Sequence, residues 1–181
     1  MLPKIIFRHS WLYDKSLKRP AKFKIPNDRV FDTFIQKLER QWKKDGKKIL
    51  KEIATFTKLK WHQKEIVCYV AIGVIPFSDP LTLNLRNNID TLTHELIHRI
   101  FSEPENITKI KWHRLKKLYK GESYVTNNHV VIHAVHTHVL KKLFSEKRLA
   151  AEKKSMHNPN YVRAWKIVEA EGYKNILPKL R

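Results

Sequence analysis

The chain has 181 residues, which is enough for one domain with a hydrophobic core, so we expect a single domain over residues 1–181. Hydrophobic residues make up 42% of the chain and charged residues 30%, a balance typical of globular proteins rather than disordered or fibrous ones. No segment reaches the roughly 18 apolar residues that span a bilayer, and the start lacks the apolar core of a secretory signal. Cys68 is the single cysteine and cannot form an internal disulfide, so we expect a reducing, cytoplasmic setting.

The formal net charge of +20 is concentrated at the two ends of the chain. Residues 1–64 hold 18 Lys and Arg against six acids, and residues 141–181 hold 11 against four, whereas residues 65–104 hold two against five. We expect Lys-rich helical segments at both ends. Their exposed faces are either simply solvated or bind a polyanion: a nucleic acid, an anionic membrane surface or an acidic protein.

Three segments have the residue pattern of β-strands. Residues 5–12 look extended. The run 66–75 is rich in β-branched residues and apolar on both faces, as in a central strand. Residues 81–86 alternate apolar and polar side chains, which predicts a half-buried strand, and a sheet edge is one place for it.

Helical spacing of apolar residues predicts helices before and after these strands. One helix should run from about 28 to 44, where Asp45-Gly46 would end it, and a second should reach about 60. A third should cover residues 91–101, with Asp90 as its N-cap.

The C-terminal half is expected to be helical. A Lys-rich helix over 107–119 should stop before Gly121, and a strongly apolar helix should follow over 124–144. A last helix should begin after Asn158-Pro159 and end at Gly172. Together these elements predict an α+β fold, with a small mixed sheet, an active-site helix and several packed helices.

The segment His94-Glu95-Leu96-Ile97-His98 lies inside the predicted helix 91–101. Positions i and i+4 of a helix differ by about 40° around the axis, so His94 and His98 project from one face and can bind one metal ion. Zinc suits two imidazole ligands well. Glu95 projects beside the pair, where its carboxylate can act as the general base toward a water activated by the metal.

Hydrolytic zinc sites usually have three protein ligands, so a third must come from elsewhere in the chain. The predicted helix 124–144 carries His129, His133 and His136 within about 60° of one another on an otherwise apolar face. Burying three imidazoles requires metal, hydrogen bonds or water. His129 or His133 is the favoured third ligand, and Glu122, His136 and His113 remain alternatives.

Over about residues 65–140 the sequence resembles the zincin metallopeptidases, whose HExxH helix follows a strand and whose third ligand comes from a later helix. In the thermolysin-like gluzincins that later helix carries an Asn-Glu pair, with an Asp four residues after the Glu. Asn128-His129 and His133 have this spacing, so the resemblance implies that His129 binds zinc and that His133 orients a ligand histidine. Histidine stands where the gluzincins have glutamate; the SprT-like proteases use three histidines, but their third follows more closely.

The resemblance implies a zinc-dependent peptidase in which Tyr124 or His136 stabilises the oxyanion and the strand at 81–86 pairs with the substrate backbone. One alternative is a zinc peptidase that binds DNA or RNA through its basic ends and cleaves proteins bound there, as SprT-like proteases do. Another is a non-catalytic basic module that binds nucleic acid or a structural metal. Glu95 separates these alternatives, because a structural metal site needs no general base.

Overall fold

The computed structural model describes residues 1–16 and 25–181, which form four strands and eight α-helices. The predicted α+β class is confirmed. The chain divides into two compact units, Met1–Leu50 with Trp61–Arg99 and Lys51–Lys60 with Ile100–Arg181. The single domain over 1–181 stays a prediction. Among the helices of the described residues, none combines the length and apolar character that crossing a bilayer requires.

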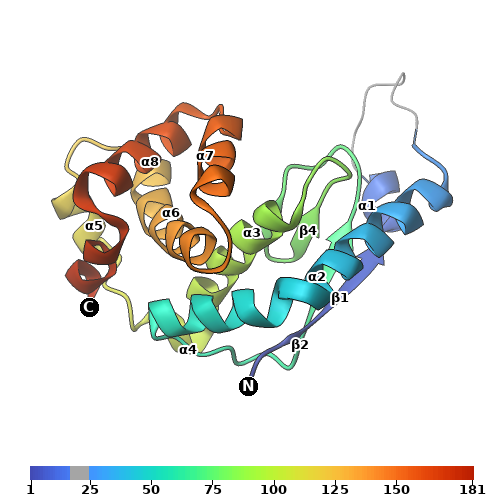
Figure 1. Cartoon of the computed structure of the whole chain (residues 1–181), viewed down its shortest axis with the longest axis horizontal. Helices are drawn as coiled ribbons and strands as arrows, with labels where there is room; N and C mark the ends of the chain where they lie inside the picture. The colour runs from blue at the N-terminus through green and yellow to red at the C-terminus, as the bar shows by residue number, and fades with distance from the viewer. Residues whose placement is uncertain (17–24) are drawn as a thin grey trace. The chain divides into compact units, whose positions relative to one another are not determined.

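The strands of the first unit form one mixed sheet in the order β1-β2-β4-β3; Figure 1 labels β1, β2 and β4. β1 and β2 are parallel over six residue pairs, β2 and β4 are also parallel, and β3 runs antiparallel to β4. The central position predicted for the 66–75 strand is confirmed, since β2 lies between β1 and β4. The bounds are Lys4–His9 for β1, Glu65–Val70 for β2, Phe77–Ser78 for β3 and Leu81–Leu83 for β4.

β2 ends at Val70, five residues before the predicted end. The Ile72 backbone N–H donates to the Asp14 carboxylate at 2.9 Å rather than to a neighbouring strand. Asp14 lies in the short helix α1, Trp11–Ser16, and is only 4% exposed. Gly73 then takes a φ of 65°, a left-handed conformation that ends strand geometry.

The strand predicted at 81–86 is present as β4, but the prediction that it is half-buried at a sheet edge is wrong. β4 lies between β2 and β3, and all three of its residues are buried. Thr82, the polar residue of the alternating pattern, is fully buried, and its hydroxyl donates to the Pro80 carbonyl at 2.8 Å. A hydroxyl that forms a hydrogen bond can be buried, so the alternation of apolar and polar residues does not mean here that the polar residues are exposed.

The long helix α2, Asp28–Thr57, corrects the predicted break at Asp45-Gly46. Gly46 is helical and buried, and a Cβ at this position would overlap the Trp42 ring, which lies across it one turn earlier. The helix ends where Lys58 takes a φ of 53°. The apolar face of its first half packs on the sheet in a cluster around Phe31, Val70 and Ile72.

The helix α3, Ile89–Ser102, carries the HExxH segment. Its cap is Asn88 rather than the predicted Asp90: the Asn88 side-chain oxygen accepts hydrogen bonds from the backbone N–H groups of Asp90, at 2.8 Å, and Thr91, at 3.0 Å. Arg99, near the other end, donates to the Asp79 carboxylate at 2.6 Å. The Arg99 contact ties the last turns of the helix to the turn between β3 and β4, since Arg99 also donates to the Ser78 carbonyl at 3.0 Å.

After α3 the second unit continues with two short helices, α4 at Pro104–Ile107 and α5 at His113–Leu118. The single helix predicted over 107–119 is therefore wrong. The Asn106 side-chain amide donates to the Ile100 carbonyl, and the Trp112 ring contacts the Phe101 ring at 5.3 Å, edge to face. These tertiary contacts bend the chain between two segments that helical spacing alone would join.

The helix α6, Tyr124–Leu143, is the centre of the second unit, and α5, α7 and α8 contact it (Figure 1). The predictions of a helix over 124–144 and of a last helix, α8 at Pro159–Glu171 between Asn158 and Gly172, are confirmed. The helix α7, Glu146–Ser155, lies in the C-terminal part that was expected to be Lys-rich and helical, but its bounds were not predicted. Two short 3-10 helices, η1 at Tyr173–Asn175 and η2 at Leu177–Leu180, end the chain.

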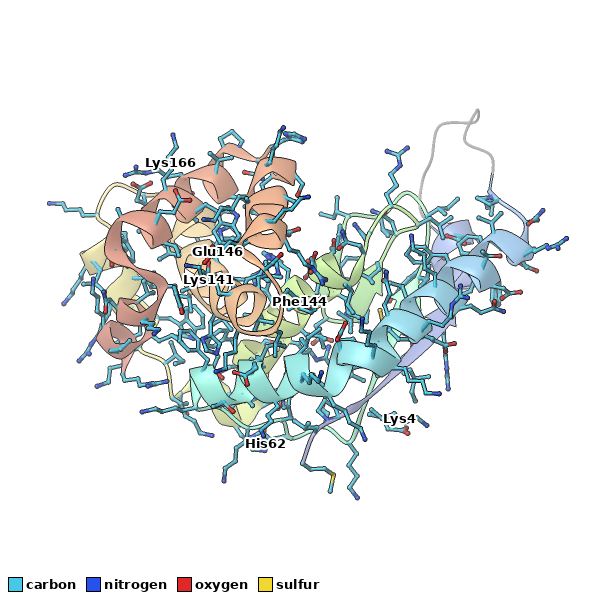
Figure 2. All side chains as sticks on the ribbon, in the orientation of Figure 1. Lys4, His62, Lys141, Phe144, Glu146 and Lys166 are labelled. Atoms are coloured by element: carbon cyan, nitrogen blue, oxygen red, sulfur yellow. The ribbon has the colours of Figure 1, made fainter. Side chains whose placement is uncertain are left out.

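The junction of α6 and α7 is stabilised by charge and by aromatic packing. Lys141 and Glu146 form an ion pair at 2.9 Å, and Phe144 lies in the same region (Figure 2). The guanidinium of Arg148 lies over the Phe144 ring at 3.7 Å from its centroid. The core beneath is made by Leu140, Leu149 and Trp165.

Candidate metal centre

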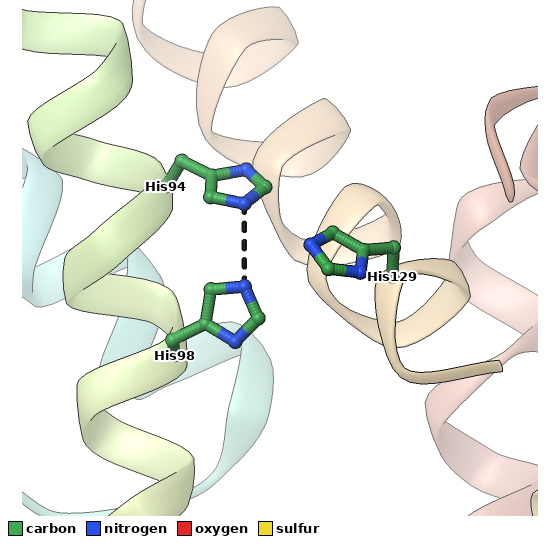
Figure 3. A group of neighbouring side chains, drawn as sticks. All are labelled: His94, His98 and His129. Atoms are coloured by element: carbon green, nitrogen blue, oxygen red, sulfur yellow. Dashed lines mark hydrogen bonds between the residues drawn. The ribbon is translucent and has the colours of Figure 1, made fainter. Parts of the chain in front are cut away.

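His94 and His98 lie one turn apart on α3, as their spacing predicts. Their Nε2 atoms are 3.2 Å apart and share a hydrogen bond, and the two rings meet at an interplanar angle of 63° (Figure 3). His94 is 5% exposed and His98 is half-buried. Two ring nitrogens therefore point toward the same small volume from one helix.

Glu95 is buried beside this pair, with 8% of its surface exposed. Burial raises the pKa of its carboxyl from an ordinary 4.5 to about 7, because the charged form loses hydration. On β2, burial raises the pKa of the Cys68 thiol, and the negative charge of Glu95 raises it further. Glu95 thus titrates near neutral pH, as a group that both accepts and releases a proton should.

His129 lies on α6 and is 7% exposed. Its Nδ1 is 2.8 Å from the Val125 carbonyl oxygen, and since a carbonyl can only accept, Nδ1 carries the proton. Nε2 is then the nitrogen with the lone pair. Burial lowers the pKa of His129, and the hydrogen bond to Val125 opposes this effect in part. The neutral imidazole that results is the form that binds metal ions.

His94, His98 and His129 form a group in which the nitrogen atoms able to bind a metal lie within 4.8 Å of one another (Figure 3). In a tetrahedral zinc site with Zn–N bonds of about 2.0–2.1 Å, two ligand nitrogens are about 3.3 Å apart. The His94–His98 distance of 3.2 Å matches this value. Among the described residues, this is the group that contains the HExxH histidines, and the third member is the predicted His129.

His133 and His136 also lie on α6, and neither is exposed to solvent. The His133 ring stacks on Trp165 with centroids 4.1 Å apart, and its centroid is 5.5 Å from that of His129. The centroid of the His136 ring is 6.2 Å from that of the same Trp165 ring. Neither belongs to the group of potential ligands. Their position beside Trp165 is that of packed core histidines.

The remaining alternatives have other surroundings. Glu122 forms an ion pair with Arg163 at 2.6 Å, which occupies one of its carboxylate oxygens. Tyr124 is 80% exposed at the first turn of α6. His113 is exposed at the start of α5. None of the three joins the group around His94, so their predicted roles as ligand or oxyanion stabiliser stay predictions.

Tyr161 of α8 is a residue that the sequence did not associate with the site. Its ring stacks on His129 with centroids 3.9 Å apart and an interplanar angle of 25°. The sequence pattern placed Tyr161 only on the apolar side of the last helix. Which ring it would cover depends on how α8 packs against α6, and residue spacing carries no signal for that.

Comparisons with known proteins found no relative of this chain. A scan against protein-family models found no match, and searches of curated proteins and of solved structures found no similar protein. The chemistry of the site therefore rests on its own residues.

Proposed function

We propose that this protein is a zinc-dependent metallopeptidase that hydrolyses peptide bonds, with zinc held by His94, His98 and His129. The observation that supports it best is on α3: the two imidazole nitrogens 3.2 Å apart, with a buried carboxyl group between them in sequence. A buried carboxyl beside two imidazoles is expensive to keep unless it has a chemical role.

The donor set fits zinc. Three imidazoles are ligands of the kind that zinc accepts in hydrolytic sites, and three protein ligands leave one position open. When bound, zinc supplies Lewis acidity toward water and toward a peptide carbonyl. The hydrogen bond from His129 Nδ1 to Val125 orients its ring and leaves Nε2 as the donor atom.

Glu95 would move the proton. Its carboxylate accepts a proton from the attacking water and passes it to the amine that leaves when the peptide bond breaks. In the metal-free protein burial raises the pKa of this carboxyl to about 7, so near neutral pH it can bind a proton as well as release one. A purely structural metal site would have no use for this carboxyl, which favours an enzyme over a structural metal module.

The experiment combines metal analysis with hydrolysis of an unstructured protein such as casein. The wild type should carry one zinc per chain and cleave casein. Glu95→Gln should keep the zinc and lose a factor of roughly 10²–10⁴ in rate, the usual contribution of a general base. His94→Ala and His129→Ala should lose the zinc.

His113→Ala is the matched control, because His113 is exposed and lies outside the group. It should keep both zinc and activity. Wild-type protein without zinc, or Glu95→Gln with full activity, would overturn the proposal. If His129→Ala retained zinc, the third ligand would be another residue. The activity of Glu95→Gln would then decide whether the protein is a peptidase.

A further inference from the structure

A row of basic side chains follows the solvent side of α2 within the first unit. At 100° per residue its members fall within about 100° of the helix circumference. The buried side of the same helix is apolar and includes Phe31, Leu38 and Ile49. We name the row the α2 basic face; its five residues, all exposed, are Lys37, Arg40, Lys44, Lys47 and Lys48.

No acidic residue interrupts the α2 basic face. Asp32, Glu39 and Asp45 lie about 110° or more around the axis from the middle of the row. Within the described residues, none of the five cations forms an ion pair or a side-chain hydrogen bond. Some cations elsewhere on the surface are paired, for example Lys153 with Glu169 at 2.6 Å.

The spacing places like charges next to one another. Lys44 is an i,i+4 neighbour of both Arg40 and Lys48. Like charges at this spacing repel one another and destabilise the helix, most strongly at low salt. An anionic partner would remove this repulsion. The row therefore has the properties of a binding face for a polyanion.

The composition of the face selects among polyanions. None of its five residues is apolar, and Val30, near the start of α2, is the one large apolar residue of the helix that is exposed, which is too little apolar surface to insert into an anionic membrane. The face also has no aromatic ring on which unpaired bases could stack, which disfavours single-stranded nucleic acid. What remains is contact with a regular row of phosphates.

We infer that the α2 basic face binds the phosphate backbone of double-stranded DNA without regard to sequence. From Lys37 to Lys48 the helix rises roughly 16 Å, so the five cations are spaced about 4 Å apart on average, comparable to the 3.4 Å rise per phosphate of one strand along the axis of a DNA duplex. A helix also fits the roughly 12 Å major groove of DNA but not the deep, narrow groove of an RNA duplex. This inference does not depend on the metal site.

The test compares two full-length variants of equal net charge. In the face variant, Gln, which keeps helix propensity, replaces all five residues of the α2 basic face. The matched control replaces five exposed lysines of the second unit with Gln: Lys111, Lys116, Lys117, Lys120 and Lys154. Circular dichroism and thermal unfolding should give the same result for both variants as for the wild type, which shows that both are folded.

Binding is measured with a fluorescent DNA duplex of mixed sequence. Wild type and control should bind alike and lose roughly 10²–10³-fold in affinity between 50 and 200 mM salt, as expected for about five phosphate contacts. The face variant should bind at least about tenfold more weakly at 50 mM salt and show a smaller salt dependence.

Three results would overturn the inference. Equal loss in both variants would mean that net charge rather than the α2 basic face attracts DNA. Tighter binding of an RNA duplex, of phosphatidylserine vesicles or of polyglutamate would assign the face to that partner. If the wild-type protein does not bind DNA at 50 mM salt, the inference is wrong.

Discussion

Glu95 is a carboxyl group at a position surrounded by core side chains. Leu92, Leu96 and Ile97 of the same helix are all fully buried. An apolar residue between them would stabilise the fold, because a charged carboxylate loses its hydration on burial. The cost is smallest when the carboxyl is protonated, and this links the stability of the protein to pH.

We predict that metal-free protein loses stability as the pH rises through neutrality. The folded state raises the pKa of Glu95 from 4.5 to about 7, so its contribution is fully present below about pH 4.5 and is lost as the pH rises through 7. The loss should be on the order of 3 kcal/mol in the free energy of unfolding.

Urea unfolding in EDTA at several pH values between 4.5 and 8 measures this loss. Glu95→Gln has no carboxyl to titrate at this position, so its free energy of unfolding should not show this loss with pH. Plotted against pH, the stabilities of the variant and the wild type should therefore cross. If the two curves run parallel, burial does not raise the pKa of Glu95 in the folded protein.

At the scale of single elements, α2 shows how a neighbouring side chain overrides a local signal. Asp45-Gly46 predicts a break because glycine costs about 1 kcal/mol in a helix interior. The helix continues, and the Trp42 ring covers the bare Gly46 backbone. Glycine here provides room for a ring rather than a turn.

We expect Gly46→Ala to destabilise the protein, although alanine is the better helix former. The new Cβ would meet the Trp42 ring, which would have to move, at a cost of about 1–3 kcal/mol that outweighs the helix propensity gained. Thermal unfolding of Gly46→Ala, Trp42→Ala and the double variant measures this. In the Trp42→Ala background, Gly46→Ala should stabilise instead; destabilisation in both backgrounds would argue against the ring contact.

The elements that the sequence predicts well are those whose signals are local and agree. α6 and α8 have caps at Ser123 and Asn158 and long apolar patterns. The failures depend on distant partners. β2 ends early because Asp14, 58 residues away in sequence, binds the Ile72 N–H. The break between α4 and α5 depends on packing around Asn106, which residue spacing does not encode.

The same distinction applies to the candidate site. The facing of His94 and His98 follows from i,i+4 spacing, because one helix holds both. The spacing could not choose between His129 and His133, which share a face of α6. Their surroundings differ: His133 stacks on Trp165, whereas His129 joins the group with His94 and His98.

For the whole molecule, the proposed zinc should add to the stability of the fold, since a ligand that binds only the folded chain raises its free energy of unfolding. At a zinc concentration about 1,000 times the Kd the gain is about 4 kcal/mol, or roughly 8–16 °C in Tm for a chain of this size.

Thermal unfolding with zinc and with EDTA tests this prediction. The wild type and Glu95→Gln should show the full difference in Tm, because Glu95 is not a ligand. His94→Ala should show none. An equal Tm with and without zinc in the wild type would contradict the metal site.

The charge of the chain has a further consequence at β1, which ends the sheet on one side. The outer edge of such a strand offers unpaired backbone groups on which a second copy could add its own strand, the first step of aggregation. Lys4 and Arg8 are exposed on β1. Charged side chains on an edge strand oppose that pairing, and in a molecule of +20 net charge every approaching copy is also repelled. Positive charge would thus keep the sheet from growing beyond one molecule.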